Sequence, residues 1–336
     1  MALISLRQLL DHAAENNYGV PAFNVNNLEQ IRAVMEGAKE TNSPVIIQAS
    51  AGARKYAGSN FIKSMMDAAI REFPSIPIVM HQDHGASPSA CKESIDLGFS
   101  SVMMDGSLLE DQKTPADFDY NVKVTKETSS LAHSLGVSVE GELGCLGSLE
   151  TGEAGEEDGV GHDIEEGADS SHLYTQPEDV LKAYDLLTPI GHFSVAASFG
   201  NVHGVYKPGN VQLRPEILKN SQELVSKTHG TDEKPLNLVF HGGSGSEKDK
   251  IAAAISYGVF KMNIDTDTQF AFSEGVGKYV EEHTNAFKYQ IDPETGAPLK
   301  KFYDPRKWLR AGEQSFVKRL DEAFIDLGSV GRSLAK

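Results

Sequence analysis

The sequence has 336 residues, of which 40% are apolar and 24% charged, a composition typical of a globular protein rather than a disordered chain. Its 48 acidic residues outnumber its 31 basic residues, so the formal net charge is −17. Without a basic excess the chain cannot displace counterions from a polyanion, and neither nucleic acid nor an anionic membrane surface is expected as a partner. The charge is also uneven, because residues 127–181 contain 14 acidic residues and no lysine or arginine.

The cysteine content and the N-terminal segment predict a soluble, cytoplasmic protein. Cys91 and Cys145 are too few for a disulfide framework and fit a reducing compartment. Residues 1–17 have charged residues among their apolar ones, so they predict an amphipathic helix rather than a signal peptide. No apolar run approaches the roughly 18 residues that a membrane span needs.

Short apolar runs rich in β-branched residues alternate with amphipathic segments along the chain. Leu28, Ile31 and Met35, for example, form an apolar stripe at helical spacing. Eight strand–helix units predict an α/β fold of the (β/α)8 or TIM-barrel type. A doubly wound open sheet is the alternative, because alternation alone does not show closure. The expected strands are residues 22–25, 44–50, 77–84, 101–107, 138–144, 192–200, 236–243 and 260–266.

Two segments exceed this strand–helix pattern. A long loop rich in glycine and acidic residues is expected after the fifth strand, from residue 145 to the start of a helix near Pro177. After the eighth unit, residues 290–303 predict a hairpin with Pro-Glu-Thr-Gly at its turn, and residues 308–327 predict a closing helix. We therefore expect one barrel domain over residues 1–336, with a C-terminal extension over about residues 287–336.

Polar or ionisable residues are expected at the carboxyl ends of all eight strands, where barrels of this type carry their catalytic groups. Buried charges are costly unless they are paired or bind a metal, so this set indicates a functional site. In chain order the residues are Asn24, Ser50, Asp83, His84, Asp105, Glu140, Glu142, Ser198, His203, His241, Asn263 and Asp265.

Three histidines, His84, His203 and His241, lie at or just beyond different strand ends. Three protein ligands with an open fourth position are typical of catalytic zinc, and neutral imidazole suits Zn²⁺. Each histidine alone could instead be a cap or a satisfied core residue, and only the set of three favours a metal. Asp105 and Glu142 could supply a second metal position or be solvated loop acids.

Two segments are suited to binding phosphate. HGGSGS (residues 241–246) follows the seventh strand, NIDTDT (residues 263–268) follows the eighth, and each leads into a helix. Backbone N–H groups at helix N-termini bind anions, and barrels commonly hold phosphate after these two strands. Ordinary N-capping by Ser246 and by Asp265 or Thr266 is the alternative. The candidate cations for an anionic substrate are Arg54, Lys207, Lys300 and Arg306.

The chain also contains longer motifs, namely HQDHG (81–85), EGELGC (140–145), EEDGV (156–160), FGNVHGVYKPGNV (199–211), FHGGSG (240–245), KMNIDTDTQ (261–269) and YDPRKWLRAG (303–312). Together they resemble the class II, metal-dependent fructose-1,6-bisphosphate aldolases. The resemblance extends from about Pro21 to Leu327, and its character is similar to the aldolases of Calvin-cycle operons.

The resemblance implies the reversible cleavage of D-fructose 1,6-bisphosphate into dihydroxyacetone phosphate and D-glyceraldehyde 3-phosphate through a metal-stabilised enediolate. Sedoheptulose 1,7-bisphosphate is implied as a further substrate. The resemblance also implies a TIM barrel, a catalytic Zn²⁺ with a second metal position, a monovalent cation, and a homodimer or homotetramer.

Carried over by position, the resemblance implies that His84, His203 and His241 hold the zinc ion, with Asp105 and Glu142 at a second or alternative metal position. Asp83 would exchange a proton with the C4 hydroxyl, and Glu157 in the acidic loop would move the proton on the dihydroxyacetone phosphate carbon. Because adjacent strand residues point to opposite faces, we expect the strand to end by Asp83. The implied substrate contacts are Asn24, Ser50, Gly204, Lys207, Gly242, Gly243, Ser244, Asn263, Ile264, Asp265 and Thr266, with Lys300 and Arg306 at the second phosphate and Arg306 coming from across a dimer interface.

Several alternatives remain open at this point. A Schiff-base aldolase could use Lys261, which lies within the eighth expected strand in register with Asn263. A tagatose-bisphosphate aldolase would differ only in the stereochemistry of one hydroxyl. A zinc hydrolase on a barrel would use the metal to activate water, and a phosphosugar-binding module would need no catalytic carboxylate beside a zinc ligand.

Overall fold

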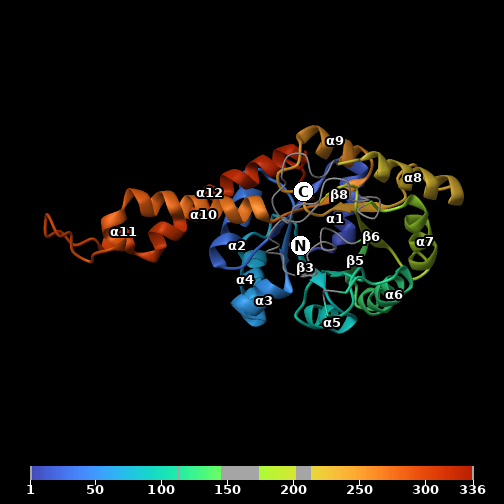
Figure 1. Ribbon diagram of the computed structural model, residues 1–336, viewed down its shortest axis with the longest axis horizontal. Helices are drawn as coiled ribbons and strands as arrows, with labels where there is room; N and C mark the ends of the chain where they lie inside the picture. Colours follow the sequence, from blue (N-terminus) through green and yellow to red (C-terminus); the bar gives the residue numbers. More distant parts are fainter. Residues whose placement is uncertain (1, 112–113, 145–173, 202–212, 335–336) are drawn as a thin grey trace.

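Parallel strands form a closed barrel surrounded by helices, which is the (β/α)8 or TIM-barrel architecture (Figure 1). The computed structural model describes residues 2–111, 114–144, 174–201 and 213–334. Among them, eight strands pair in chain order and the eighth closes on the first, so the open-sheet alternative is wrong. The strands are β1 (Val20–Asn24), β2 (Val45–Ala49), β3 (Ile78–Gly85), β4 (Ser101–Met104), β5 (Ser138–Leu143), β6 (Phe193–Ala197), β7 (Asn237–Phe240) and β8 (Val259–Ile264).

Helices follow the strands on the outside of the barrel, and several begin at a side-chain cap. Ser5, Asn27, Ser50, Ser87 and Asp117 each accept a hydrogen bond from the backbone N–H three residues further on. Within the described ranges, no helix is long and apolar enough to cross a membrane. The helices are α1 (Leu6–Asn16), α2 (Leu28–Glu40), α3 (Ala51–Ala57), α4 (Ser59–Glu72), α5 (Pro88–Asp96), α6 (Phe118–Ser134), α7 (Pro177–Leu187), α8 (Glu216–His229), α9 (Lys248–Ser256), α10 (Thr266–Glu282), the 3-10 helix η2 (Thr284–Phe287), α11 (Lys300–Tyr303) and α12 (Pro305–Asp326).

The main apolar core lies between the strands and the surrounding helices, and a second cluster closes the amino-terminal end of the barrel. In the second cluster, Leu6, Leu9 and Leu10 of α1 pack with residues near the start of β1 and β8, including Val20 and Phe260. The amphipathic N-terminal helix predicted from the sequence is therefore present. It leaves the opposite end of the barrel, where the strands finish, as the place for a site.

The strand carrying Asp83 and His84 does not end before them, contrary to the expectation. β3 continues to Gly85, but its register with β4 shifts between Gln82 and Gly85. His84 has a left-handed backbone with φ of 40° in this stretch. Such an irregularity redirects side chains that an ideal strand would point to opposite faces. Both side chains therefore reach the same site because the strand bends.

The segments that follow β4 and β5 can be compared with the sequence prediction. α7 begins at Pro177 as predicted, and the acidic loop predicted before it falls mostly at residues 145–173, outside the described residues. β4 ends at Met104, earlier than predicted. The chain packs tightly there, because a Cβ on Gly106 would lie only 2.8 Å from the Cα of Asn121.

The C-terminal part of the chain projects from the barrel as an arm (residues 275–310), drawn in orange in Figure 1. α10 runs outward from β8, and α12 returns beside it. The two backbones approach closely at Gly275, where a Cβ would lie 2.6 Å from the Ala311 carbonyl oxygen. The predicted hairpin consists of a single antiparallel bridge between Ile291 and Pro298, and the predicted closing helix starts at Pro305.

Candidate active site

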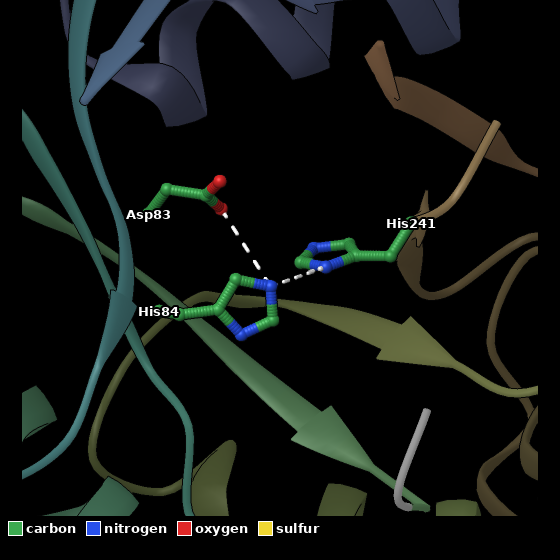
Figure 2. Close-up of side chains that lie close together, drawn as sticks. All are labelled: Asp83, His84 and His241. Atoms are coloured by element: carbon green, nitrogen blue, oxygen red, sulfur yellow. Dashed lines mark hydrogen bonds and ion pairs between the residues drawn. The ribbon is translucent and has the colours of Figure 1, made fainter. Parts of the chain in front are cut away.

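The carboxyl ends of β3 and β7 bring three ionisable side chains together. Asp83 and His84 lie near the end of β3 and His241 directly follows β7, and Figure 2 shows the three side chains pointing toward one another. His84 Nε2 lies 3.2 Å from His241 Nδ1 and 4.0 Å from Asp83 Oδ1. Residues predicted from separate strand ends therefore form one cluster.

The other ring nitrogen of His84 faces two carboxylates from β4 and β5. His84 Nδ1 lies 3.0 Å from Asp105 Oδ2 and 3.8 Å from Glu142 Oε2. Asp105 Oδ1 accepts hydrogen bonds from the backbone N–H and the hydroxyl of Ser107, at 3.1 and 2.6 Å. A carboxylate at one nitrogen commonly orients an imidazole whose other nitrogen binds a metal. His84 thus joins two groups of candidate ligands.

Burial and neighbouring charges shift the pKa values of this cluster in different directions. Burial would raise the pKa of Asp83, but the adjacent His84 and His241 rings outweigh it and lower that pKa to about 2. Burial opposes charge on His84, yet Asp83 and Asp105 raise the pKa of His84 well above its usual value. Burial, reinforced by Asp105, raises the pKa of Glu142 well above that of a free carboxyl. The site therefore holds an ionised Asp83 close to an imidazole pair.

Three amide side chains hold the Asp83 carboxylate. Asn24 and Gln48 donate to Asp83 Oδ2 at 2.9 and 3.1 Å, and Asn263 donates to Asp83 Oδ1 at 3.3 Å. Gln48 also donates to Asn24 Oδ1 at 2.5 Å. Hydrogen bonds from amides favour the ionised carboxylate and fix its orientation. Asp83 is therefore set in place by β1, β2 and β8 as well as by its own strand.

An inner layer of fully buried side chains (His81, Glu140 and Lys261) lies one step deeper in the barrel. Lys261 Nζ lies 2.9 Å from Glu140 Oε2 and donates to Asn263 Oδ1 at 2.7 Å. Glu140 Oε1 lies 2.7 Å from His241 Nε2. Burial, with the positive charge of Lys261, lowers the pKa of His81 well below its usual value. Through Glu140 of β5 and Lys261 of β8, the inner layer connects His241, which follows β7, with Asn263 of the neighbouring β8.

The donor set of the cluster fits a divalent metal ion. The ligand atoms of Asp83, His84 and His241 all lie within 4.8 Å of one another, and His84, Asp105 and Glu142 form a second such group. Glu142 Oε2 is buried and, within the described part of the chain, has no hydrogen-bond partner. A buried carboxylate oxygen left in this way is stabilised by a cation, and nitrogen with oxygen ligands suits Zn²⁺.

The loops after β7 and β8 lie against each other. Gly243 N–H donates to the Asn263 carbonyl at 3.2 Å, and a Cβ on Gly243 would clash with the Met262 methyl carbon. N-capping by the Ser246 or Asp265 side chain is not observed, because neither makes a side-chain cap bond to α9 or α10. Asp265 instead accepts from Gln269 at 2.9 Å. Gly242, Ser244, Ile264 and Thr266 lie in the same two loops or the strand end beside them.

Other predicted residues lie away from the cluster or outside the described residues. The Ser50 hydroxyl accepts the cap bond from Ala53 N–H. Lys300 and Arg306 lie on the arm, which Figure 1 shows projecting away from the barrel, so the single chain does not bring them to the cluster. Arg306 is 87% exposed and pairs with Asp304 at 2.7 Å. Glu157, His203, Gly204 and Lys207 lie outside the described residues.

Sequence reasoning did not single out Gln48 and His81, and it gave Lys261 a different role. Gln48 and His81 sit within strands that are otherwise mostly apolar, and both are fully buried. The available signal was a polar residue two positions before a candidate site residue, Ser50 for Gln48 and Asp83 for His81, since residues i and i+2 share a strand face. Lys261 is paired with Glu140 in the barrel interior.

A family model described as fructose-bisphosphate aldolase class-II matches residues 4–332. The chain belongs to the class-II fructose-bisphosphate aldolase family. A fructose-bisphosphate aldolase of Pseudomonas aeruginosa is 51% identical over 312 residues, covering 85% of this chain and 84% of the relative. One from Xanthobacter flavus is 45% identical over 350 residues, covering 99% of this chain and 93% of the relative.

A solved structure has the same fold over almost the whole chain. The crystal structure of a fructose-bisphosphate aldolase from Campylobacter jejuni superimposes with a TM-score of 0.76 at 42% identity, covering 98% of this chain and 97% of the other. Enzymes of this family depend on a metal ion, which agrees with the donor groups around His84. Family membership therefore favours a metal-dependent aldolase over a Schiff-base aldolase, a hydrolase or a binding module.

Proposed function

We propose that the protein is a zinc-dependent aldolase that reversibly cleaves D-fructose 1,6-bisphosphate to dihydroxyacetone phosphate and D-glyceraldehyde 3-phosphate. The observation that carries this proposal is the cluster of an ionised Asp83 beside the His84 and His241 rings at the carboxyl end of the barrel. A module that only bound a phosphosugar would have no use for such a carboxylate. Family membership supports the same reaction.

His84 Nε2, His241 Nδ1 and His203 are the proposed zinc ligands. His203 lies outside the described residues, but Asn201, two residues before it, donates to the His241 carbonyl at 2.9 Å. Two residues span at most about 7 Å, so the position of Asn201 supports the proposal that His203 is the third ligand. Asp105 and Glu142 are proposed to hold a second or alternative metal position. A bound zinc ion would supply Lewis-acid polarisation of the substrate ketone and stabilise negative charge on its oxygen.

Asp83 is the proposed base for the C4 hydroxyl of the substrate. As Asp83 takes this proton, the C3–C4 bond breaks, its electron pair remains on C3, and the aldehyde forms at C4. The amides of Asn24, Gln48 and Asn263 keep the carboxylate oriented for this step. Glu157 is proposed to return a proton to C3, which completes dihydroxyacetone phosphate.

The loops at residues 241–246 and 263–268 are proposed to bind the phosphate of the dihydroxyacetone half. The proposed donors are the backbone N–H of Ser244 and the amino-terminal turn of α10, with Gly242 and Gly243 shaping the loop around the phosphate. Gly204, Ile264, Asp265 and Thr266 complete this half of the site. Ser50 and Lys207 are proposed as further contacts, and a monovalent cation is proposed to bind near the phosphate.

Lys300 and Arg306 are proposed to reach the second phosphate of a site in another copy of this chain. They lie on an arm that projects from its own barrel, so a neighbouring copy is the way for them to serve the reaction. This arrangement supports a homodimer or homotetramer. We further propose a cytoplasmic location and activity on sedoheptulose 1,7-bisphosphate.

The test is to measure cleavage of fructose, tagatose and sedoheptulose bisphosphates before and after treatment with EDTA, followed by addition of Zn²⁺. We expect fructose bisphosphate cleavage to stop on chelation and to return with zinc. Activity that survives complete removal of the metal would contradict the proposal. A clear preference for tagatose bisphosphate would assign the chain to the stereochemical alternative.

A further inference from the structure

One ion pair links the closing helix to both loops that are proposed to bind phosphate. Arg319 on α12 donates through Nη2 to Asp267 Oδ2 at 2.8 Å, and Asp267 lies in the first turn of α10. Asp267 Oδ2 also accepts the backbone N–H of Gly245 at 3.0 Å, from the loop after β7. The backbone N–H of Asp267 donates to the Ser244 hydroxyl at 3.3 Å. Asp267 therefore joins the two loops, and Arg319 holds Asp267.

The charge of Asp267 poses a problem for an anion-binding site. A carboxylate at a helix N-terminus stabilises the helix, but it repels a phosphate dianion bound to the neighbouring N–H groups. The guanidinium of Arg319 offsets this negative charge. Both side chains are largely shielded, with 24% of the Arg319 and 30% of the Asp267 side chain exposed, so screening by water is reduced.

The Arg319 guanidinium also has N–H groups that do not bond to Asp267. Arg319 Nη1 is buried and makes no hydrogen bond to any part of the chain that the structure describes. Buried N–H groups of arginine are usually paired, and an uncompensated one favours a nearby negative charge. The Nη1 group, unpaired among the described residues, therefore agrees with a role of Arg319 in providing positive charge beside the two loops that are proposed to bind phosphate.

We propose that Arg319 is a positioning residue for phosphate binding, which acts by neutralising Asp267 and fixing it as the bridge between the two loops. The inference rests on the proposed function, because the anion is the substrate phosphate. Arg319 does not touch the reacting carbons. Its loss is expected to weaken substrate binding and to leave the chemical step nearly unchanged.

The experiment measures KM and kcat for fructose 1,6-bisphosphate and inhibition by inorganic phosphate in the zinc-loaded Arg319→Met, Asp267→Asn and double variants. We expect Arg319→Met to raise KM and the phosphate inhibition constant about tenfold, with kcat within about twofold of wild type. Arg319→Lys should recover part of the loss. The double variant should recover most of it, because the amide introduced by Asp267→Asn can still accept from Gly245 N–H but carries no charge to repel the anion.

A matched control comes from the same helix. Arg310 pairs with Glu36 and Glu313 at 2.7 Å, away from the phosphate loops. Arg310→Met is therefore expected to lower stability without changing KM. If Arg319→Met behaved like Arg310→Met, or if the double variant bound phosphate no better than Arg319→Met, the inference would be overturned.

A third variant separates this inference from the proposed site itself. Gly243→Ala places a methyl group against Met262 and the Asn263 carbonyl, so it should raise KM if the loops bind phosphate. An increase in KM for Gly243→Ala with none for Arg319→Met would reject only the role of Arg319. No change in either variant of a protein that cleaves the substrate would reject the phosphate loops.

Discussion

At the scale of single residues, Asp83 is the best-supported side chain in the site. It is buried, ionised and held by amides from three other strands. Its neighbour His84 has a left-handed backbone, a conformation that costs a residue other than glycine roughly 1–2 kcal/mol. The surrounding barrel tolerates this cost because the same geometry turns His84 toward His241.

Asp83→Asn is expected to lower kcat by about 10²–10⁴-fold, the usual contribution of a positioned general base. Asparagine keeps the shape of the side chain, and the His84 and His241 ligands stay in place. Zinc content measured by elemental analysis should therefore remain near that of wild type. A variant that lost its zinc would instead place Asp83 among the metal ligands, and one that kept full kcat would remove it from the reaction.

The sequence identified the residues at the strand ends, but it did not show that Asn24, Asn263 and Glu140 among them support Asp83 and His241. Asp83, His84 and His241 lie within short motifs at the ends of predicted strands, so their place at the carboxyl end of the barrel follows from the strand pattern. The contact between Glu140 and Lys261 joins residues 121 positions apart in the chain and depends on closure of the barrel. The bend at His84 depends on a register shift that no local pattern reveals.

At the scale of elements, the arm depends on two helices whose backbones nearly touch. The strands were predictable to within a few residues because buried parallel strands are continuous apolar runs. The arm was predicted only in outline, since α10 and α12 approach closely at Gly275 and Gly312, and a contact made by a glycine leaves no apolar signal in the sequence. Gly275 faces Ala311 and Ser315, and Gly312 faces Phe272.

Gly275→Ala is expected to destabilise the protein by about 1–3 kcal/mol, because the added methyl group would lie 2.6 Å from both the Ala311 carbonyl oxygen and the Ser315 Cβ. Gly277→Ala is the matched control on the same helix. It has nothing within 4 Å, so the better helix propensity of alanine should raise stability by up to about 1 kcal/mol. Denaturant unfolding measures both. Equal effects of the two substitutions would show that the helices do not depend on this contact.

At the scale of the whole molecule, the interior of the barrel contains a buried ion pair, Lys261 with Glu140, and is not entirely apolar. Lys261 and Glu140 have no exposed surface, and each comes from a strand on a different side of the barrel. Removing one partner of a buried ion pair leaves an uncompensated charge, whereas replacing both with apolar residues of similar size is often neutral or stabilising.

Lys261→Met alone is therefore expected to lower the free energy of unfolding by about 3–5 kcal/mol. The double variant Lys261→Met, Glu140→Met should recover that loss and could exceed wild type by about 1–4 kcal/mol. Both variants should lose activity, since Glu140 no longer supports His241 or Lys261 no longer supports Asn263. Unfolding of metal-free protein by denaturant tests this. Equal stability of the single and double variants would contradict the account.

The inner layer has a practical consequence for attempts to improve this protein by directed evolution. A library selected only for survival at high temperature would be enriched in variants with apolar replacements in the barrel interior, because replacing both partners of the buried ion pair is often neutral or stabilising. The clones that such a screen selects would be stable but would lack aldolase activity. A selection that alternates heating with growth on the reaction product would instead keep the interior charges and drive improvement to the helices and the arm.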